Sequence, residues 1–167
     1  DRALGKLTGH LDFSFSYTAD EVVILLNGKK ITGKLRSEKA GAFASKIAAI
    51  PAVRAALVQR QREFRRLPGL VADGRDMGTV IFPDAKLKIF LTASVNARAD
   101  RRYKQLKKQG ENVNLSRLCR DIEKRDKRDM SRSISPLVPA SDAQLIDSTE
   151  MSIEMVLNEI YRLLEIH

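Results

Sequence analysis

The sequence predicts an α/β protein with a small antiparallel unit in its N-terminal third. Short apolar runs at residues 70–72, 87–91 and 144–146 alternate with segments of helical periodicity, which is typical of a parallel sheet covered by helices. Upstream, three short strand-like runs follow one another closely, separated by turn residues. With 167 residues and 43% hydrophobic content, the chain is long enough for one domain with a sizeable core and a small inserted subdomain.

The antiparallel unit consists of three predicted strands, over residues 11–15, 22–26 and 31–35. Asn27-Gly28 between the second and third is a strong hairpin signal. The same region contains GKKITGKL, which fits the first seven letters of the phosphate-loop pattern G-x-x-x-x-G-K-[ST]. Leu35 stands where that pattern needs a metal-binding hydroxyl, so we interpret the segment as a β-hairpin and not as a phosphate loop.

The first two predicted helices follow this unit. Ser37 is a candidate N-cap for a helix over residues 38–50, which Pro51 ends, and a second helix over residues 52–66 stops before Pro68-Gly69. Further helices are predicted over residues 96–109, which Gly110 stops, 115–130 and 152–166. We expect six apolar side chains of the last helix to face inward: Ile153, Val156, Leu157, Ile160, Leu163 and Leu164.

Charge is distributed unevenly along the chain, which has a formal net charge of +9. Residues 98–132 contain thirteen Lys or Arg and six Asp or Glu, whereas residues 133–167 contain one and six. A basic centre beside an acidic tail suggests an anionic ligand, although solvated helix faces are the alternative interpretation. Only 5% of residues are aromatic and none is Trp, so stacking platforms for single-stranded nucleic acid would be sparse.

Cysteine, histidine and apolar content restrict the class of protein. A single Cys119 excludes a disulfide framework, and two histidines leave little for a histidine-based metal centre or general base. No apolar run approaches the ~20 residues that span a bilayer, and the first residues lack the layout of a signal peptide. We therefore expect a cytoplasmic protein that binds no membrane.

A first candidate site is the glycine-flanked turn DGRDMG. Asp73, Arg75 and Asp76 lie together at the end of the strand predicted at residues 70–72. Burying these charges costs free energy unless they are paired or solvated, so the turn should face a cleft. The alternative is an ordinary exposed turn with a local Asp–Arg pair.

A second candidate site is KRDKRDMSR, residues 124–132. On a helix, Arg125, Asp129 and Arg132 share one face, while Arg128 lies on the neighbouring stripe. Arginine binds phosphate through two parallel hydrogen bonds, and an interleaved Asp can orient an arginine or accept from a sugar hydroxyl. Asp–Arg pairs at this spacing are also common on exposed helix faces, and that alternative remains open.

A third basic stripe opens the helix predicted over residues 96–109, and it consists of Arg98, Arg101, Arg102 and Lys104. Cations on a mobile segment could close over a triphosphate and exclude water, as phosphoryl transfer requires. The alternative is again a solvated helix face.

Two stretches together closely resemble bacterial cytidylate kinases: LPGLVADGRDMGTVIFPDAKLKIFL and RDKRDMSRSISPLVPASDAQLIDST. These are P-loop enzymes that transfer the γ-phosphoryl group of ATP to CMP or dCMP. The resemblance covers essentially the whole chain, and DGRDMGTV-x-FPDA is highly specific. It implies a parallel-sheet P-loop kinase core, incomplete in these residues, with a three-stranded insert that binds the nucleoside monophosphate and a helical lid. The implied boundaries are 1–68 for the insert and its helices, 69–97 and 133–167 for the core, and 98–132 for the lid region and the phosphate- and pentose-binding helix.

The resemblance also implies roles for individual residues. It assigns the cytosine base to Ser45, Arg54 and Asp76, and the pentose to Arg125 and Asp129. It assigns the monophosphate and catalysis to Arg75 and Arg132. The ATP phosphates are assigned to three arginines of the lid, namely Arg98, Arg101 and Arg102. From its place at a strand end, Asp73 is expected to orient metal-bound water. The base assignment is chemically consistent because the exocyclic amine of cytosine donates to a carboxylate, whereas uracil would present a carbonyl to Asp76.

Members of this family begin with a strand and a Walker A loop, and we expect both to lie outside these 167 residues. Mg²⁺ should accompany ATP, and we expect most of its ligands to lie outside these residues as well. Activity of these residues by themselves is doubtful because the Walker A loop is absent. An intact mass equal to the 18.7 kDa of this sequence would contradict that expectation. The expected partners are CMP, dCMP and ATP, with no nucleic acid, and the expected state is a monomer. Two alternatives stay open: a basic nucleic-acid-binding module that uses residues 98–132, and an inactive fragment that keeps part of the CMP site.

Overall fold

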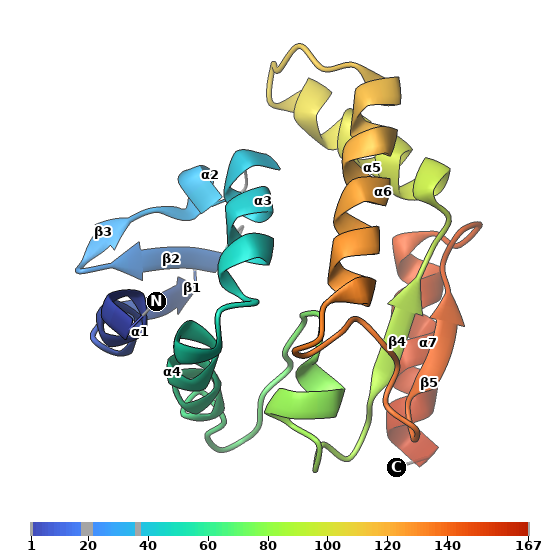
Figure 1. Cartoon of the computed structure of the whole chain (residues 1–167). Coiled ribbons are helices and arrows are strands. Elements are labelled where there is room, and N and C mark those ends of the chain that lie inside the picture. Colours follow the sequence, from blue (N-terminus) through green and yellow to red (C-terminus); the bar gives the residue numbers. More distant parts are fainter. Residues whose placement is uncertain (1, 18–21, 36–37, 167) are drawn as a thin grey trace. The chain divides into compact units, whose positions relative to one another are not determined.

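A computed structural model of the chain describes residues 2–17, 22–35 and 38–166 (Figure 1). The chain divides into two compact units, Asp1–Val71 and Ala72–His167. The first unit contains a small antiparallel sheet and helices, and the second contains a parallel sheet and helices. The α/β fold class that the sequence predicts is therefore confirmed. The finer assignment of an insert, a core and a lid stays a prediction.

The sheet of the first unit has the strand order β1-β2-β3, and both pairings are antiparallel. Its strands are β1 (Phe13–Tyr17), β2 (Val22–Leu26) and β3 (Lys29–Lys30). Asn27 and Gly28 have φ angles of 49° and 71°, as the two central residues of a type I′ turn require. The hairpin prediction for the start of GKKITGKL is thus confirmed.

The strand predicted over residues 31–35 is wrong, because the chain turns into the short helix α2 (Thr32–Leu35). The backbone N–H of Ile31 still donates to the carbonyl of Ile24 at 2.9 Å. The buried hydroxyl of Thr32 then accepts from the N–H of Ile24 at 2.8 Å. This side chain satisfies a donor of β2 that a continuing third strand would otherwise use, so the ladder ends there.

Three longer helices complete the first unit: α1 (Arg2–Gly9), α3 (Glu38–Ile47) and α4 (Pro51–Arg62). The sequence predicted α3 and α4 but not α1. Helix α4 ends four residues before its predicted end. The proposed cap Ser37 lies outside the described residues. Pro51 occupies the first turn of α4, where its missing N–H costs no hydrogen bond. Helices α1 and α4 approach closely, since a β-carbon on Gly5 would lie 2.9 Å from the carbonyl oxygen of Ala52.

Helices α3 and α4 meet at an angle of 104°. Pro51 follows directly after the bend, which fits its exclusion from the interior of a continuous helix. In the described part of the chain, no single helix has both the length and the apolarity to cross a membrane, and α3 with α4 reaches that limit only as a bent pair.

Aromatic side chains hold the sheet of the first unit against the end of α4. The ring of Phe64 lies 5.3 Å from that of Phe13 and 5.1 Å from that of Phe15, which share one face of β1. The guanidinium of Arg60 lies 5.6 Å from the Phe13 ring centroid and donates to the carbonyl of Leu11 at 3.1 Å. These edge and cation–π contacts close the unit over one side of the sheet.

In the second unit, β4 (Ile89–Thr92) and β5 (Gln144–Asp147) pair in parallel, with Ile89 opposite Gln144. Helix α7 (Ile153–Ile166) follows β5. Of the six side chains expected to face inward, Leu163 is buried and Val156 and Ile160 are partly buried, but Ile153, Leu157 and Leu164 are exposed. That part of the prediction is wrong, because a sheet of two strands is too narrow to cover the whole apolar stripe of the helix.

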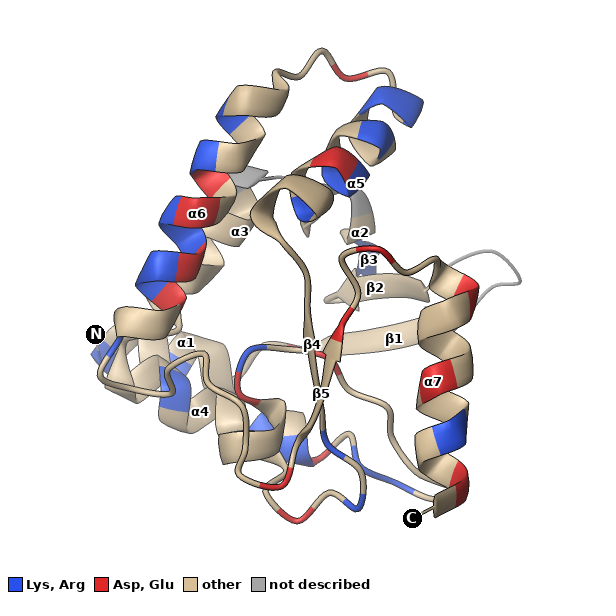
Figure 2. Cartoon of the chain, turned by 90° about the vertical axis from the view of Figure 1, so that its right-hand side faces the viewer, with Lys and Arg blue, Asp and Glu red and all other residues tan. Residues whose placement is uncertain are grey.

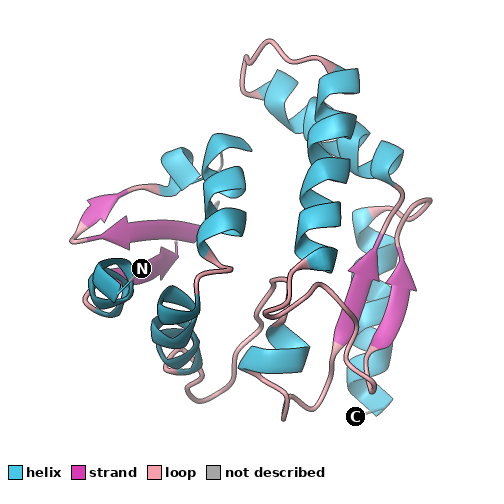
Figure 3. Cartoon of the chain, in the orientation of Figure 1, coloured by secondary structure: helices cyan, strands magenta, loops and turns pink. Residues whose placement is uncertain are grey.

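The strand predicted over residues 70–72 is also wrong. Figure 3 draws this stretch as a loop, and Val71 is fully exposed. A strand needs a hydrogen-bonding neighbour, and among the described residues no strand pairs with this stretch. After the bend that follows, the chain forms a short π-helix, η1 (Met77–Ile81), whose last residue Ile81 is buried.

The sequence correctly predicted helices α5 (Val95–Lys108) and α6 (Leu115–Ser131). They form an antiparallel hairpin above the parallel strands (Figure 1). Ser94 caps α5 by accepting from the N–H of Ala97 at 3.2 Å, and Asn114 caps α6 by accepting from that of Arg117 at 2.9 Å. Gly110, with a φ of 79°, follows the end of α5. The two helices meet through a small apolar core of Ala99, Leu106 and Leu118.

Candidate functional site

The most concentrated charge cluster of the second unit surrounds Asp129, a buried residue near the C-terminal end of α6. Nε of Arg75 donates to Oδ2 of Asp129 at 3.0 Å, and Nε of Arg125 lies 3.7 Å from the same oxygen. Nη1 of Arg132 lies 3.9 Å from the other carboxylate oxygen. One carboxylate among three guanidinium groups leaves a formal excess of two positive charges, which suits a dianionic ligand such as a phosphate monoester.

Two distant segments build this cluster. Arg125 and Asp129 come from one face of α6, as the sequence predicted from their spacing. Arg132, which was predicted on the same face, lies in extended backbone directly after the helix, and Arg75 comes from the bend 54 residues before Asp129. Figure 2 shows basic and acidic residues alternating along α6. The loop after α6 folds back onto the helix, because the N–H of Leu137 donates to the carbonyl of Asp129 at 2.8 Å and Nε of Arg132 donates to that of Ser135.

The DGRD turn divides its charged side chains between the surface and the interior. Asp73 is exposed, Arg75 is half-buried and reaches Asp129, and Asp76 is buried. The carbonyl of Asp76 accepts from the N–H groups of Val80 at 2.9 Å and Ile81 at 3.2 Å, and the second of these is the i to i+5 bond of η1. Such π-helical turns are frequent at functional sites. The alternative of an ordinary exposed turn is therefore wrong for Arg75 and Asp76.

Ser45 and Arg54 belong to the first unit, on α3 and α4 respectively, one before and one after the bend between these helices. Both side chains are buried and both interact with other groups. Burial of a serine and an arginine in a small unit is unusual and requires polar partners. Asp76 belongs to the second unit, so the recognition of one base by all three residues stays a prediction.

All three arginines assigned to a lid bind protein groups in the second unit. Arg98 donates through Nη1 and Nη2 to the two carboxylate oxygens of Asp126, at 3.1 and 2.6 Å, and through Nε to the carbonyl of Ala93 at 3.1 Å. Arg102 is half-buried on α5 and donates to Oε1 of Gln105 at 2.8 Å. Contact between these arginines and ATP phosphates remains a prediction.

Arg101 binds the loop that follows β5. Its guanidinium donates to the hydroxyl of Ser148 at 3.1 Å, to the carbonyl of the same residue and to that of Met151 at 3.3 Å. Ser148 is buried, and its N–H and hydroxyl donate to the carbonyl of Thr92 at 2.8 and 3.0 Å. Arg101 therefore ties the start of α5 to the carboxyl ends of both parallel strands, where ligands of α/β proteins bind.

The same strand ends hold a second polar network that sequence reasoning missed. Oδ1 of Asp147 accepts from the N–H of Thr149 at 2.9 Å and from its hydroxyl at 2.6 Å. These two bonds, the hydroxyl first, lower the pKa of Asp147 below its ordinary value. The hydroxyl of Thr149 in turn accepts from the N–H of Ser94 at 2.9 Å. Residue spacing gives no signal for these contacts, since Ser94 and Thr149 are 55 positions apart.

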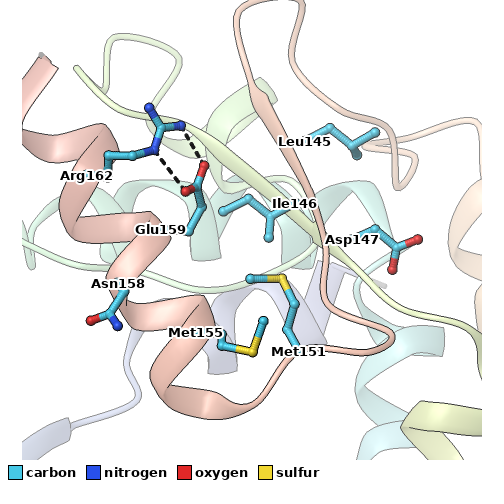
Figure 4. Close-up of a pocket in the computed structure, with 8 residues that line it drawn as sticks. All are labelled: Leu145, Ile146, Asp147, Met151, Met155, Asn158, Glu159 and Arg162. Carbon is cyan, nitrogen blue, oxygen red and sulfur yellow. Dashed lines mark hydrogen bonds and ion pairs between the residues drawn. The ribbon is translucent and has the colours of Figure 1, made fainter.

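A pocket of about 560 Å³ lies between β5 and α7, apart from the predicted site residues (Figure 4). Ile146, Met151 and Met155 line it, together with Glu159 and Arg162, which form an ion pair at 2.6 Å. In the part of the chain that the structure describes, no three His, Cys, Asp or Glu side chains cluster in a way that could hold a metal ion. We therefore derive no metal-ligand set from these residues.

The parallel strands and the arginine cluster define an α/β protein with a charge arrangement that suits an anionic ligand, and the comparisons with known proteins identify the family. The sequence profile of the cytidylate kinase family matches residues 1–166. A cytidylate kinase of Pseudomonas paraeruginosa is 57% identical over 162 residues, covering 96% of this chain and 71% of the relative. That of Klebsiella pneumoniae is 51% identical over 159 residues, covering 95% and 70%. The chain belongs to the cytidylate kinase family, and the resemblance that the sequence motifs suggested is confirmed.

Proposed function

We propose that this protein catalyses the transfer of the γ-phosphoryl group of ATP to CMP or dCMP, which yields ADP and CDP or dCDP. The observation that carries the proposal is the family match over residues 1–166. The cluster around Asp129 supports it, because a nucleoside monophosphate presents a dianionic phosphate next to a pentose with hydroxyl groups. A basic nucleic-acid-binding module, which the sequence left open, has no support in the comparisons.

The proposal assigns the phosphate of CMP to Arg75 and Arg132. Both guanidinium groups contact Asp129, so their orientation is fixed before a ligand binds. A phosphate oxygen of CMP attacks the γ-phosphorus of ATP while the bond to the leaving ADP oxygen breaks, and no covalent enzyme intermediate is needed. Arginine donors stabilise the charge that shifts between the two nucleotides during this step.

The pentose is assigned to Arg125 and Asp129. A carboxylate oxygen is an acceptor that suits a sugar hydroxyl, and the guanidinium of Arg125, whose Nε lies 3.7 Å from Oδ2 of Asp129, supplies donors for a sugar oxygen. In this proposal Asp129 has two functions, since it holds arginines in position and also accepts from the pentose.

The cytosine base is assigned to Asp76, Arg54 and Ser45. A buried carboxylate accepts from the exocyclic amine of cytosine, while Arg and Ser donate to its ring nitrogen and carbonyl acceptors. UMP would place a carbonyl oxygen against Asp76 and leave both groups without a donor. This chemistry supports a strong preference for CMP and dCMP over UMP.

Mg²⁺ would accompany ATP and would offset part of the phosphate charge. Of the carboxylates near the site, the exposed Asp73 is the one we assign to orienting metal-bound water. A lid function of Arg101 and Arg102, the monomeric state and a cytoplasmic location remain proposals of the same kind.

The test is ATP-dependent phosphorylation by the full polypeptide, with CMP, dCMP, UMP and AMP as acceptors and with and without Mg²⁺. We expect activity largely confined to CMP and dCMP, and a loss of about 100-fold in kcat/KM for CMP in Asp76→Ala, because a buried hydrogen-bond partner of the base is removed. Asp121→Ala, which removes an exposed carboxylate of α6, is the matched control. Equal activity with UMP, or no transfer to any of the four nucleotides, would contradict the proposal.

A further inference from the structure

We propose that Arg98 is a positioning residue that acts through Asp126: this ion pair fixes α6 against the end of β4 and so sets the place of the arginine cluster around Asp129. The inference rests on the proposed function, and it gives Arg98 a different role from the contact with ATP phosphates that the sequence suggested. Its basis is the set of contacts that Arg98 makes and the place of Asp126 on α6.

The geometry of the pair is that of a strong arginine–carboxylate interaction. Two guanidinium nitrogens of Arg98 donate to the two oxygens of Asp126 at 3.1 and 2.6 Å. Such parallel bonds restrict both distance and orientation, which a single contact does not. The carboxylate of Asp126 is largely buried, with 15% of its side chain exposed, so solvent competes weakly for it.

Arg98 is also anchored on its other side. Its Nε donates at 3.1 Å to the carbonyl of Ala93, a buried residue directly after β4. The guanidinium therefore connects the carboxyl end of a strand to the middle of α6 by three hydrogen bonds. Each of its three nitrogens already donates to a protein acceptor, so protein groups set the orientation of the guanidinium.

The position of Asp126 explains why this connection matters for the site. Asp126 directly follows Arg125 and precedes Asp129 by three residues on the same helix. A helix transmits a shift at one residue to its neighbours, because each turn is held by backbone hydrogen bonds. Arg98 holds α6 at Asp126 and Arg75 holds it at Asp129. These two arginine contacts fix the part of the helix that presents the cluster.

Single and double substitutions of the pair test this proposal, namely Arg98→Gln, Asp126→Asn and the combination of both. Arg117→Gln and Asp121→Asn provide a matched control, since this pair lies on the same helix but is exposed. Two quantities are measured on the full polypeptide: amide hydrogen exchange across residues 123–132, and the KM values for CMP and for ATP.

We expect each single substitution to speed exchange in residues 123–132 about tenfold and to raise the KM for CMP by a similar factor, with the KM for ATP changed less than about twofold. The double variant should resemble either single variant, because both remove the same interaction. The control substitutions should change neither quantity.

The proposal is overturned if Asp126→Asn leaves exchange and the KM for CMP unchanged while Arg98→Gln raises the KM for ATP, which is the result expected of a direct phosphate contact. Additive effects in the double variant would also overturn it. If Arg98→Gln does not fold, Asp126→Asn alone decides between the two results. Failure of the proposed function can be recognised separately. If the unmutated protein does not phosphorylate CMP, hydrogen exchange in the variants still shows whether the pair holds α6.

Discussion

Helix α6 contains two Arg–Asp pairs with the same spacing and the same separation but with different surroundings. In the first half of the helix, Nε of Arg117 lies 3.7 Å from Oδ2 of Asp121, and the side chains are 78% and 49% exposed. In the second half, Nε of Arg125 lies 3.7 Å from Oδ2 of Asp129, and the side chains are 39% and 2% exposed. The local geometry of one pair is therefore no guide to its importance.

Burial and additional partners separate the two halves of the helix. An exposed pair at this spacing stabilises a helix by about 0.3–0.5 kcal/mol and is screened by salt. The buried carboxylate of Asp129 is shared with Arg75 and Arg132, so it organises three cations instead of neutralising one. Removal of a buried member of such a network leaves charges without compensation, which costs much more.

The largest effect is expected for Asp129→Ala. Without the carboxylate, three guanidinium groups repel one another around an apolar gap, and we expect a loss of about 3 kcal/mol in the free energy of unfolding. CMP phosphorylation should fall at least about 100-fold, since arginine orientation and the pentose acceptor are both lost. Denaturant unfolding and steady-state kinetics measure the two effects. Asp121→Ala is the control, and a similar loss in that variant would remove the distinction between the two halves.

A somewhat smaller effect is expected for Arg132→Lys. The Arg132 side chain is 8% exposed, contacts Asp129 and donates to the carbonyl of Ser135. Lysine keeps the charge but lacks the planar, forked guanidinium that makes both contacts. We therefore expect kcat/KM for CMP to fall about 30-fold and the free energy of unfolding to fall by about 1 kcal/mol. Wild-type kinetics in the lysine variant would mean that charge alone suffices at this position.

The contrast within α6 also shows how far the sequence could predict the site. Helical spacing correctly placed Arg125 and Asp129 on one face of α6, because that relation depends only on local geometry. It failed for Arg132, because the helix ends one residue earlier and Arg132 is extended. Arg117 and Asp121 have the same spacing on the same helix, so spacing alone does not distinguish the two pairs. Burial decides between them, and burial depends on tertiary contacts such as that from Arg75, 54 residues away in the chain.

The same limit applies to the fold. Local signals predicted the Asn27-Gly28 hairpin and the helices α5 and α6, which are stabilised by their own turns and caps. They failed at residues 70–72, where an apolar run suggested a strand but pairing with another strand decides the outcome. The Arg98–Asp126 pair was missed for the same reason, since no periodicity relates two residues 28 positions apart.

An intermediate effect is expected for Arg125→Gln, which removes one cation and leaves Asp129 with Arg75 and Arg132. The side chain is 39% exposed, so the change in stability should stay below about 1 kcal/mol. If Arg125 contacts the pentose, the KM for CMP should rise about tenfold with kcat changed less, since a binding contact is lost and the reacting groups keep their positions. An unchanged KM for CMP and dCMP would remove Arg125 from the site.

The smallest effect is expected for Arg117→Gln, the counterpart of Arg125→Gln in the exposed half of α6. Its pair with Asp121 is accessible to water and ions, so the free energy of unfolding should change by less than about 0.5 kcal/mol, and by still less at high salt. The KM for CMP should not change. This variant tests the comparison most sharply, because its substitution, helix and partner spacing match those of Arg125→Gln. A rise in KM here would mean that the basic surface of the whole helix attracts the nucleotide through long-range electrostatics, and that burial around Asp129 does not by itself define the site.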